Sequence, residues 1–394
     1  MKLNKGKHAQ TKPVVIVVAN RTFALSNSRK LLIDSLIRAD LHVVVCASVD
    51  SYTSEIIDLG VEFLPLPFYR GGLSILKDIS TLLFFIRVLK SYKPVVVHAF
   101  NAKPVIFTGV ALKITRIKAQ SVSVITGLGH AFIHGGFIRK IAGLGYRFSL
   151  KRKGNTTVFQ NPDDAKMFIE NAWVRSRHSS VIVGSGVDIK TFSPKHHSQP
   201  ESADSAVRVL MVGRLLGEKG VMEFLDAARY VKNKYRGKVN FILVGEHDKV
   251  HPDSIDLGKV TSAVEAGDIE FLGYRNDIPE LMLNTDIFVL PSYREGTPRT
   301  VLEAAACGVP CIGADVPGTR ESIVNKKTGY LVPVKNSKAL AVAIVDLLGD
   351  PDRRILFGKN ARKMVEEKFD ISAITQKYLD IYERKGVLFK ERSL

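Results

Sequence analysis

The chain has 394 residues, of which 45% are hydrophobic and 24% charged, which is the composition of a folded, soluble protein and excludes a largely disordered one. This length suffices for two domains with separate cores. The net charge of +18 is uneven, because residues 79–162 contain no Asp or Glu, so we expect an anionic partner for the first half, either nucleic acid or anionic lipid.

Short β-branched runs in the first half are predicted to form parallel strands. They alternate with helical stretches, as in right-handed βαβ units. The runs cover residues 14–19, 42–48, 94–100, 121–126 and 156–160. The basic start at 2–12 and the first run together resemble a signal peptide, but the run is brief and Asn20 and Arg21 interrupt it. We therefore predict an N-terminal strand.

The loop at 19–30 follows this first strand and contains no glycine. Two of its side chains, Arg21 and Arg29, can supply contacts to a phosphate of a donor or an acceptor. Either arginine also fits a simple charge at a helix start. The loop is therefore a candidate phosphate site with an ordinary structural alternative.

Two stretches of the basic half have the pattern of a helix at a lipid interface. Residues 74–90 mix aliphatic, aromatic and cationic side chains, and residues 137–150 have apolar residues at helical spacing with flanking cations. The apolar residues of the second stretch are Phe137, Ile138, Ile141, Leu144 and Phe148. Packing against the domain's own sheet explains either helix as well. No stretch approaches the roughly 20 apolar residues of a membrane-spanning helix.

A turn with two glycines follows the strand at 121–126. Gly127 and Gly129 permit a tight turn, and His130 comes directly after them. His134 is close in sequence, but a third ligand is lacking, so we reject a metal site. The three cysteines of the chain form no even-numbered framework and lack zinc-binding neighbours. We expect buried thiols of a reducing compartment and no metal.

The polar, proline-bearing segment 191–206 lacks periodicity and is predicted to link two domains. Beyond it, strand-like runs resume at 207–213, 239–245, 269–273, 286–291 and 310–314. The predicted organisation is an N-terminal domain at 1–190, the linker, a C-terminal domain at 207–370 and a terminal helix at 371–394. The pattern therefore predicts two doubly wound α/β domains, in each of which ligands bind at the carboxyl ends of the parallel strands.

Charged residues follow the first strand of the second half. Gly213 and Gly220 enclose a turn that contains Arg214 and Lys219. Glycine lets the backbone approach a ligand, and the two cations can converge on its negative charge. A pair of solvated cations is the alternative reading of this turn.

The segment 292–311 is the most informative of the chain, since it places Glu295 and Glu303 eight positions apart. Thr297 is predicted to cap a helix that starts at Pro298, so Glu295 lies on the loop and Glu303 in the second turn. Two carboxylates near the end of a strand can hold two hydroxyl-bearing parts of one ligand, while the helix N-terminus faces phosphate. An isolated glutamate there would be an ordinary helix-start charge or salt-bridge partner. The arrangement indicates a nucleotide-sugar site.

These segments together resemble the family-4 retaining glycosyltransferases. The stretch 292–311 matches their E-x7-E signature, and the match continues through 316–333. Residues 124–132 resemble the TGLG or EGLG loop of bacterial enzymes that build lipid-diphosphate-linked glycans. The resemblance covers nearly the whole chain and implies the GT-B fold, in which two Rossmann-like domains face each other across a cleft. It also implies that the terminal helix crosses back to the first domain.

The resemblance also implies roles for single residues. Glu295 contacts hydroxyls of the donor sugar, Glu303 binds the ribose of the donor, and Arg214 with Lys219 binds its diphosphate. His130 faces the donor sugar, although a surface or satisfied histidine is the alternative. Further donor or loop contacts are expected at Gly213, Gly296, Thr297, Tyr274, Arg275, Gly127 and Gly129.

The expected activity is that of a retaining, metal-independent glycosyltransferase without a cofactor. It moves a hexose or N-acetylhexosamine from a nucleoside diphosphate sugar to a polyprenyl-diphosphate-linked saccharide for lipopolysaccharide or capsule. We expect a cytoplasmic protein, peripheral on the inner face of the membrane. The alternatives are a nucleotide-sugar 2-epimerase of the same fold, whose acid and base pair is not evident, and a basic nucleic-acid or lipid-binding protein with a degenerate sugar site.

Overall fold

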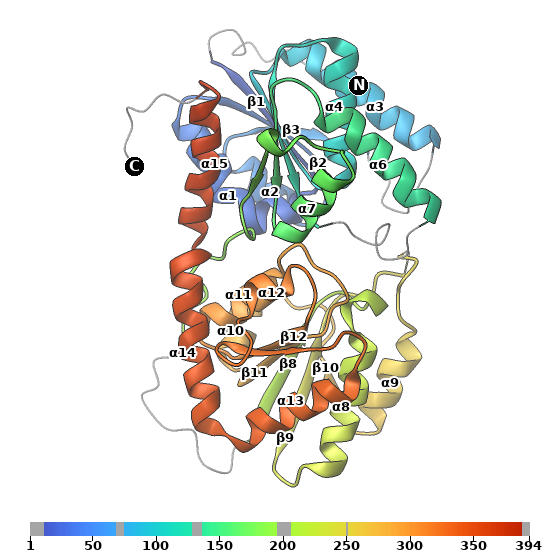
Figure 1. Ribbon diagram of the computed structural model, residues 1–394, viewed down its shortest axis with the longest axis vertical. Coiled ribbons are helices and arrows are strands. Elements are labelled where there is room, and N and C mark those ends of the chain that lie inside the picture. The colour runs from blue at the N-terminus through green and yellow to red at the C-terminus, as the bar shows by residue number, and fades with distance from the viewer. Residues whose placement is uncertain (1–11, 68–74, 128–135, 195–205, 250, 388–394) are drawn as a thin grey trace. The chain divides into compact units, whose positions relative to one another are not determined.

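The computed structural model describes residues 12–67, 75–127, 136–194, 206–249 and 251–387, and divides into two units (Figure 1). Unit 1 comprises Met1–Ser185 and Ser372–Leu394, and unit 2 comprises Gly186–Ile371. Each unit is built on one parallel sheet. His130 and Gly129 lie outside the described residues.

The described part of unit 1 contains a seven-stranded sheet in the order β3-β2-β1-β4-β5-β6-β7. The strands are β1 (Val14–Arg21), β2 (His42–Ser48), β3 (Glu62–Pro65), β4 (Val96–Phe100), β5 (Gln120–Ile125), β6 (Asn155–Phe159) and β7 (Ser179–Val181). All neighbouring pairs are parallel. The strand order reverses between β1 and β4, which is the topological switch point of a doubly wound sheet.

Helices connect these strands. They are α1 (Thr22–Arg38), α2 (Thr53–Ile57), α3 (Ile75–Tyr92), α4 (Ala102–Thr115), α6 (Gly136–Leu150) and α7 (Pro162–Glu170), with a short 3-10 turn η1 (Ser176–His178). Alternate residues of β1 belong to different cores: Val15 and Val17 pack in one cluster, Ile16 and Val18 in the other. The sheet is therefore buried on both faces, as the continuous apolar runs predicted.

The last helix, α15 (Ile371–Arg384), belongs to unit 1 from Ser372 onward. Tyr378 and Tyr382 are fully buried in the same cluster as Val15 and Val17. The Tyr382 hydroxyl lies 2.9 Å from Nδ1 of His98 on β4. Aromatic packing and one buried polar contact thus hold the end of the chain on the N-terminal sheet.

The chain passes between the units slightly earlier than the predicted residue 190. Val187 donates its N–H to the carbonyl of Phe369, and Ile371 donates to the carbonyl of Val187. Phe192 is buried, and the Phe192 carbonyl accepts a hydrogen bond from Nη1 of Arg362 at 2.8 Å. The segment 186–194 therefore packs on unit 2, because its backbone finds partners there.

The described part of unit 2 contains a six-stranded sheet in the order β10-β9-β8-β11-β12-β13. The strands are β8 (Val207–Val212), β9 (Val239–Val244), β10 (Glu270–Phe271), β11 (Ile287–Leu290), β12 (Cys311–Ala314) and β13 (Gly329–Val332). The order reverses between β8 and β11. Three short strands that the sequence pattern missed, β3, β7 and β13, lie at sheet edges, where alternation over three or four residues is too brief to read.

The helices of unit 2 lead from one strand to the next. They are α8 (Val221–Lys234), α9 (Leu257–Glu265), α10 (Ile278–Leu283), α11 (Arg299–Ala306), α12 (Thr319–Ser322), α13 (Ser337–Gly349) and α14 (Pro351–Lys368), with a 3-10 turn η2 (Gly217–Lys219). Across both units, no helix within the described residues is long and apolar enough to span a bilayer.

Candidate active site on unit 2

The turn after β8 forms the centre of the carboxyl edge of unit 2. Gly213 donates its N–H to the carbonyl of Val244 at 3.0 Å, so the ends of β8 and β9 stay paired. A Cβ on Gly245 would lie 1.8 Å from the Gly213 oxygen, which only glycine avoids. The backbone of this edge is therefore fixed by close contacts, and its loops have little freedom to move apart.

Gly220 closes the same turn against the loop that follows β11. It has φ 75°, and an added Cβ would lie 2.3 Å from the carbonyl oxygen of Pro291. Tyr293 strengthens the junction by donating its N–H to the carbonyl of Glu218 and its hydroxyl to Glu223. Because β8 and β11 are the strands at the switch point, the two loops meet where open parallel sheets bind ligands.

Lys219 and Glu295 come together across this junction. Their Nζ and Oε1 atoms are 2.5 Å apart, and the side chains are only 20% and 13% exposed. The second predicted cation, Arg214, is 46% exposed and lies 3.7 Å from Asp248. One cation is thus held by the loop glutamate, and the other is accessible beside it.

The helix that carries Glu303 starts one residue later than predicted. Pro298 occupies the N-cap position with extended backbone, α11 begins at Arg299, and no side chain caps the helix. The Thr297 hydroxyl donates to the Gly296 carbonyl instead, at 2.9 Å. The prediction that Thr297 caps the helix is therefore wrong, because its hydroxyl is engaged within the loop.

Glu303 is buried, and its partner is a residue that sequence analysis did not single out. Arg299 lies one turn earlier, with Nε 2.7 Å from Oε1 of Glu303. Burial raises the pKa of the Glu303 carboxyl, and the Arg299 charge opposes the rise. Nη1 of Arg299 is buried without a hydrogen-bond partner in the described part of the chain. The i,i+4 spacing was the available sequence signal for this pair.

The stretch 316–333, which continues the resemblance noted above, packs against the glutamate loop. Glu295 donates its N–H to the carbonyl of Pro317. Gly318 has φ 87°, and an added Cβ would lie 2.5 Å from the Glu295 carbonyl oxygen. Glu321 accepts the Gly318 N–H at 2.7 Å. This close approach fixes the backbone on which the Glu295 side chain is mounted.

Tyr274 and Arg275 follow β10 at the other end of the same edge. Tyr274 is 53% exposed. The Arg275 guanidinium is engaged by Asp277, with Nε 2.8 Å from the carboxylate. Gly273, which precedes them, adopts φ 64° and accepts the N–H of Gly245. A contact of the Arg275 side chain with the donor would therefore compete with its ion pair to Asp277. Contacts of the donor with the backbone of Tyr274 and Arg275 would leave that ion pair intact.

Within the described residues, the carboxyl edge of unit 1 combines an amide network around Asn101 with an ion pair of Arg21 and Asp50. Asn101 follows β4 with φ 72° and ψ 163°, a conformation that costs a residue other than glycine about 1–3 kcal/mol. Its amide Nδ2 donates to Thr126 at 2.7 Å, and its Oδ1 accepts the N–H of Asn20. Gly127 comes next with φ 125°. Asn101, which the sequence pattern missed, thus joins the ends of β1, β4 and β5.

The prediction of a loop at 19–30 is wrong, because β1 extends to Arg21 and α1 begins at Thr22. The two arginines proposed for this loop have different surroundings. The Nε atom of Arg21 lies 3.2 Å from Asp50. Arg29 is 4% exposed, donates to the Ser185 carbonyl at 3.1 Å, and stacks its guanidinium on the rings of Phe100 and Tyr378. This placement favours a packing role for Arg29 over the predicted phosphate contact, because its charge is enclosed by groups of its own unit.

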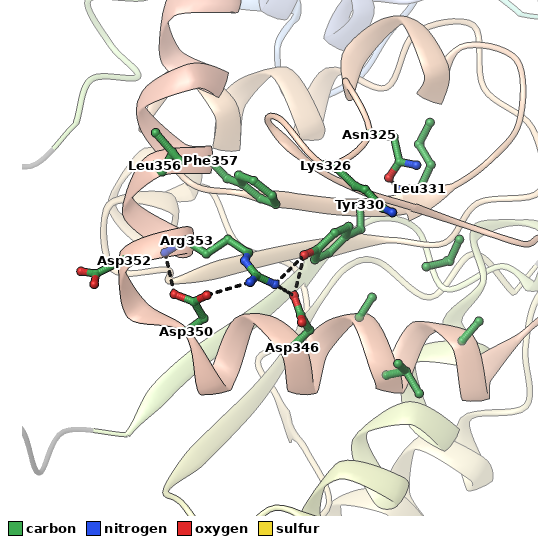
Figure 2. A pocket seen from close by; sticks show the side chains of 14 residues that line it. Asn325, Lys326, Tyr330, Leu331, Asp346, Asp350, Asp352, Arg353, Leu356 and Phe357 are labelled. Atoms are coloured by element: carbon green, nitrogen blue, oxygen red, sulfur yellow. Dashed lines mark hydrogen bonds and ion pairs between the residues drawn. The ribbon is translucent and has the colours of Figure 1, made fainter.

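A hollow in the described part of unit 2 lies away from these loops. It has a volume of about 800 Å³ and is lined by β13, α13 and α14. Figure 2 shows Arg353 between Asp346 and Asp350, at 2.5 and 2.9 Å, with the Tyr330 hydroxyl on Asp346. The charges of Arg353, Asp346 and Asp350 are thus paired with one another. None of the predicted site residues lines it, so we do not assign it to the reaction.

No group of three His, Cys, Asp or Glu side chains within the described residues could hold a metal ion. The three cysteines are free and buried, and burial raises the pKa of each thiol. They are therefore unreactive at neutral pH.

Comparisons with known proteins identify the family of the chain. The family model "Glycosyl transferases group 1" matches residues 192–364. The chain is 32% identical over 87% of its length, and 91% of the relative, to the Campylobacter jejuni N,N'-diacetylbacillosaminyl-diphospho-undecaprenol alpha-1,3-N-acetylgalactosaminyltransferase. It is 27% identical over 84% of its length, and 85% of the relative, to an Escherichia coli UDP-Gal:alpha-D-GlcNAc-diphosphoundecaprenol alpha-1,3-galactosyltransferase.

A solved structure confirms the fold class. Sucrose-phosphate synthase from Thermosynechococcus elongatus superposes with a TM-score of 0.76 at 20% identity, over 95% of this chain and 99% of that one. The predicted GT-B class of two parallel-sheet α/β domains is confirmed. The alternatives of an epimerase and of a nucleic-acid or lipid-binding protein receive no support from these relatives.

Proposed function

Since this chain belongs to the glycosyl transferases of group 1, we propose that it moves a hexose or N-acetylhexosamine from a nucleoside diphosphate sugar to a polyprenyl-diphosphate-linked saccharide. The names of the C. jejuni and E. coli relatives supply the acceptor class, and the E. coli name supplies a UDP-sugar donor. The proposed setting is bacterial surface glycan assembly. The observation that carries the proposal is the meeting of Lys219 with Glu295 at the switch point.

The donor is proposed to lie along the carboxyl edge of unit 2. Glu303 accepts hydroxyls of the ribose, and the unpartnered Nη1 of Arg299 is available to a neighbouring oxygen. Arg214 and Lys219 bind the diphosphate. Lysine has three N–H donors, so Lys219 can bond a phosphate oxygen while it keeps its contact with Glu295. Glu295 then positions the hydroxyls of the transferred sugar.

The proposed chemistry needs no protein nucleophile. An acceptor hydroxyl attacks the anomeric carbon on the face from which the diphosphate leaves, and the bond from that carbon to the phosphate oxygen breaks. The departing phosphate takes the proton of the hydroxyl. Arg214 and Lys219 stabilise the charge that develops on the leaving group, which is the part a metal ion would otherwise supply. We expect transfer to persist in EDTA.

Membrane association is proposed from the exposed faces of α3 and α6, which flank α4 (Figure 1). Leu76 on α3 is 83% exposed, and Leu144 and Phe148 on α6 are 66% and 50% exposed. Lysines and arginines surround them, and Lys113 lies 3.9 Å from the Phe148 ring centroid. Apolar side chains within a basic surface suit an anionic leaflet. The proposed location is the inner face of the cytoplasmic membrane.

A donor and acceptor panel tests the reaction. Sugars linked to UDP, GDP, TDP and ADP are screened for a rise in melting temperature, since a ligand of the native state stabilises it. The stabilising donor is then incubated with a polyprenyl-diphosphate-linked monosaccharide, and the product is analysed by mass spectrometry and NMR. Transfer with the donor's anomeric configuration kept supports the proposal. Hydrolysis or epimerisation of the donor without transfer contradicts it.

Vesicle sedimentation tests the membrane part separately. The double variant L144S/F148S should bind phosphatidylglycerol vesicles at least ten-fold more weakly than the native chain and still transfer sugar to a short-chain soluble acceptor. Unchanged sedimentation of the variant would remove α6 from the proposed surface.

A further inference from the structure

A pocket lined by lysines lies at the opposite edge of the unit 1 sheet, where β4 and β5 begin. It has a volume of about 590 Å³. Its polar lining consists of Lys90, Lys93, Lys118, Lys385 and Gln120. Along the strands it is roughly 15 Å from the carboxyl edge described above, at about 3.3 Å per residue. This pocket is therefore no part of the sites that bind donor or acceptor.

Three places in the chain bring the four lysines together, namely the end of α3, the start of β5 and the end of α15. Lys90 is in the last turn of α3, Lys93 follows that helix, Lys118 precedes β5, and Lys385 follows α15. Lys93 has φ 44°, a left-handed conformation that costs an L-residue about 1–2 kcal/mol. None of the four is ion-paired within the described residues, and no carboxylate lines the pocket there.

Lys385 is the most enclosed of these cations. Its Nζ donates to the Gly154 carbonyl at 3.0 Å and to Oε1 of Gln120 at 3.3 Å, both of them neutral acceptors. Burial, and then the nearby charge of Arg152, lower the pKa of Lys385 to about 8. Arg152 in turn donates to the Ala119 carbonyl. Within the described residues, the positive charge here is thus solvated by neutral groups and compensated by no carboxylate.

The positive region continues beyond Lys385. A second, adjoining pocket of about 360 Å³ shares Gln120 and Lys385 and adds Arg384 and His178. Burial and then the charges of Arg177, Arg175 and Lys385 lower the pKa of His178. Neighbouring cations that disfavour one another's charge are stabilised together when an anion enters.

We propose that this lysine pocket binds a phosphorylated anion. Ammonium groups are point charges that suit phosphate oxygens, and four of them around a hollow of this size fit a phosphate-bearing group. The pocket joins α15 to α3 and β5, so a bound anion also fastens the end of the chain to unit 1. The anion is either a free polyphosphate-type molecule or the headgroup of an anionic lipid, and the two share the same contacts.

Calorimetric titration with tripolyphosphate tests the soluble source. The variant R214M is the background, so that the donor edge of unit 2 does not mask binding in unit 1. Adding K118Q/K385Q should weaken binding at least ten-fold. The matched control K234Q/K259Q removes the same charge from exposed positions of unit 2 and should leave the affinity within two-fold. Circular dichroism and urea unfolding establish that each variant is folded.

Vesicle sedimentation in the otherwise native chain tests the lipid source. Phosphatidylglycerol vesicles are compared with phosphatidylcholine vesicles, for K118Q/K385Q and for its control. Loss of tripolyphosphate binding alone identifies a free anion, and loss of phosphatidylglycerol binding identifies a headgroup. Affinities of K118Q/K385Q equal to those of its control with both probes overturn the proposal. Neither result depends on the donor, so the proposed transferase activity stands or fails separately.

Discussion

The carboxyl edges of the two units use similar topology for different purposes. In unit 2 the switch point holds Lys219 against Glu295, and Arg299 lies against Glu303 on the adjoining helix. In unit 1 the corresponding position is held by the amide of Asn101, which joins three strand ends. Within the described residues, the switch point of unit 2 carries opposite charges, whereas that of unit 1 carries neutral hydrogen bonds beside the Arg21–Asp50 ion pair.

The arginines of the two edges show what this difference means. Arg214 is 46% exposed and has one distant carboxylate, so its charge is available to a ligand. Arg29 is 4% exposed between Phe100 and Tyr378, so its charge is committed to the fold. Both residues follow a first strand in sequence. Burial and partners, and not the distance from the strand along the sequence, separate an accessible cation from a structural one.

Removal of the Glu295 charge gives the largest expected effect on turnover. E295Q keeps the shape of the side chain but weakens its hold on Lys219 and on the sugar hydroxyls. We expect the transfer rate to fall about 10²–10³-fold, the range for losing one group that acts in the transition state. The control E265Q makes the same change on an exposed part of α9 and should keep native turnover. Native activity in folded E295Q would remove the glutamate loop from the mechanism.

One arginine substitution in each unit tests the proposed difference between the two edges. R29M should lower the free energy of unfolding by about 2–4 kcal/mol, because buried carbonyl and aromatic partners lose a charge-assisted contact. R214M should leave stability within about 0.5 kcal/mol, as for most exposed positions, and reduce transfer about 100-fold. Urea unfolding and initial rates measure the two quantities. A stable R29M with impaired transfer would reassign Arg29 to the ligand.

The smallest expected effect is a pH dependence of the free energy of unfolding, which arises from His98 in unit 1. Burial, and then the charge of Arg29, hold the pKa of His98 well below the ordinary histidine value of about 6.5. As the pH falls below 6.5, His98 takes up a proton in the unfolded chain but not in the folded chain. Stability is therefore present above that pH and is lost below it, by at most about 1.4 kcal/mol per pH unit.

The variant H98F isolates this contribution. It loses the contact with Tyr382 at every pH, but it should lose less further stability than the native chain between pH 6.5 and pH 5. Urea unfolding at several pH values gives both slopes. Parallel curves for native chain and variant would mean that His98 is charged in the folded state.

The sheets and the glutamate loop could be predicted from sequence, because their causes are local. Runs of β-branched residues identify buried parallel strands, and the strand before residue 292 fixes where the loop lies. Arg299 was missed although its spacing from Glu303 is a local signal. The N-cap was misplaced because Thr297 has an alternative acceptor in the Gly296 carbonyl.

Long-range packing accounts for what sequence could not reveal. Arg29 is enclosed by Tyr378, and His98 meets Tyr382 at a sequence separation of 284 residues. The lysine pocket likewise collects its side chains from helix ends and strand starts that share no motif. No periodicity encodes such contacts, since they depend on where α15 lies on the sheet.

The most direct test of a donor site on unit 2 is donor binding by E303Q, because Glu303 is buried at the carboxyl edge and contacts no acceptor in the proposed arrangement. Calorimetric titration of the preferred nucleoside diphosphate into the native chain, E303Q and the control E265Q gives three affinities. We expect E303Q to bind the nucleoside diphosphate about 10–100-fold more weakly, which is the cost of losing one charge-assisted hydrogen bond. We expect E265Q to bind it as the native chain does. Equal affinity in folded E303Q would contradict the placement of the donor on unit 2.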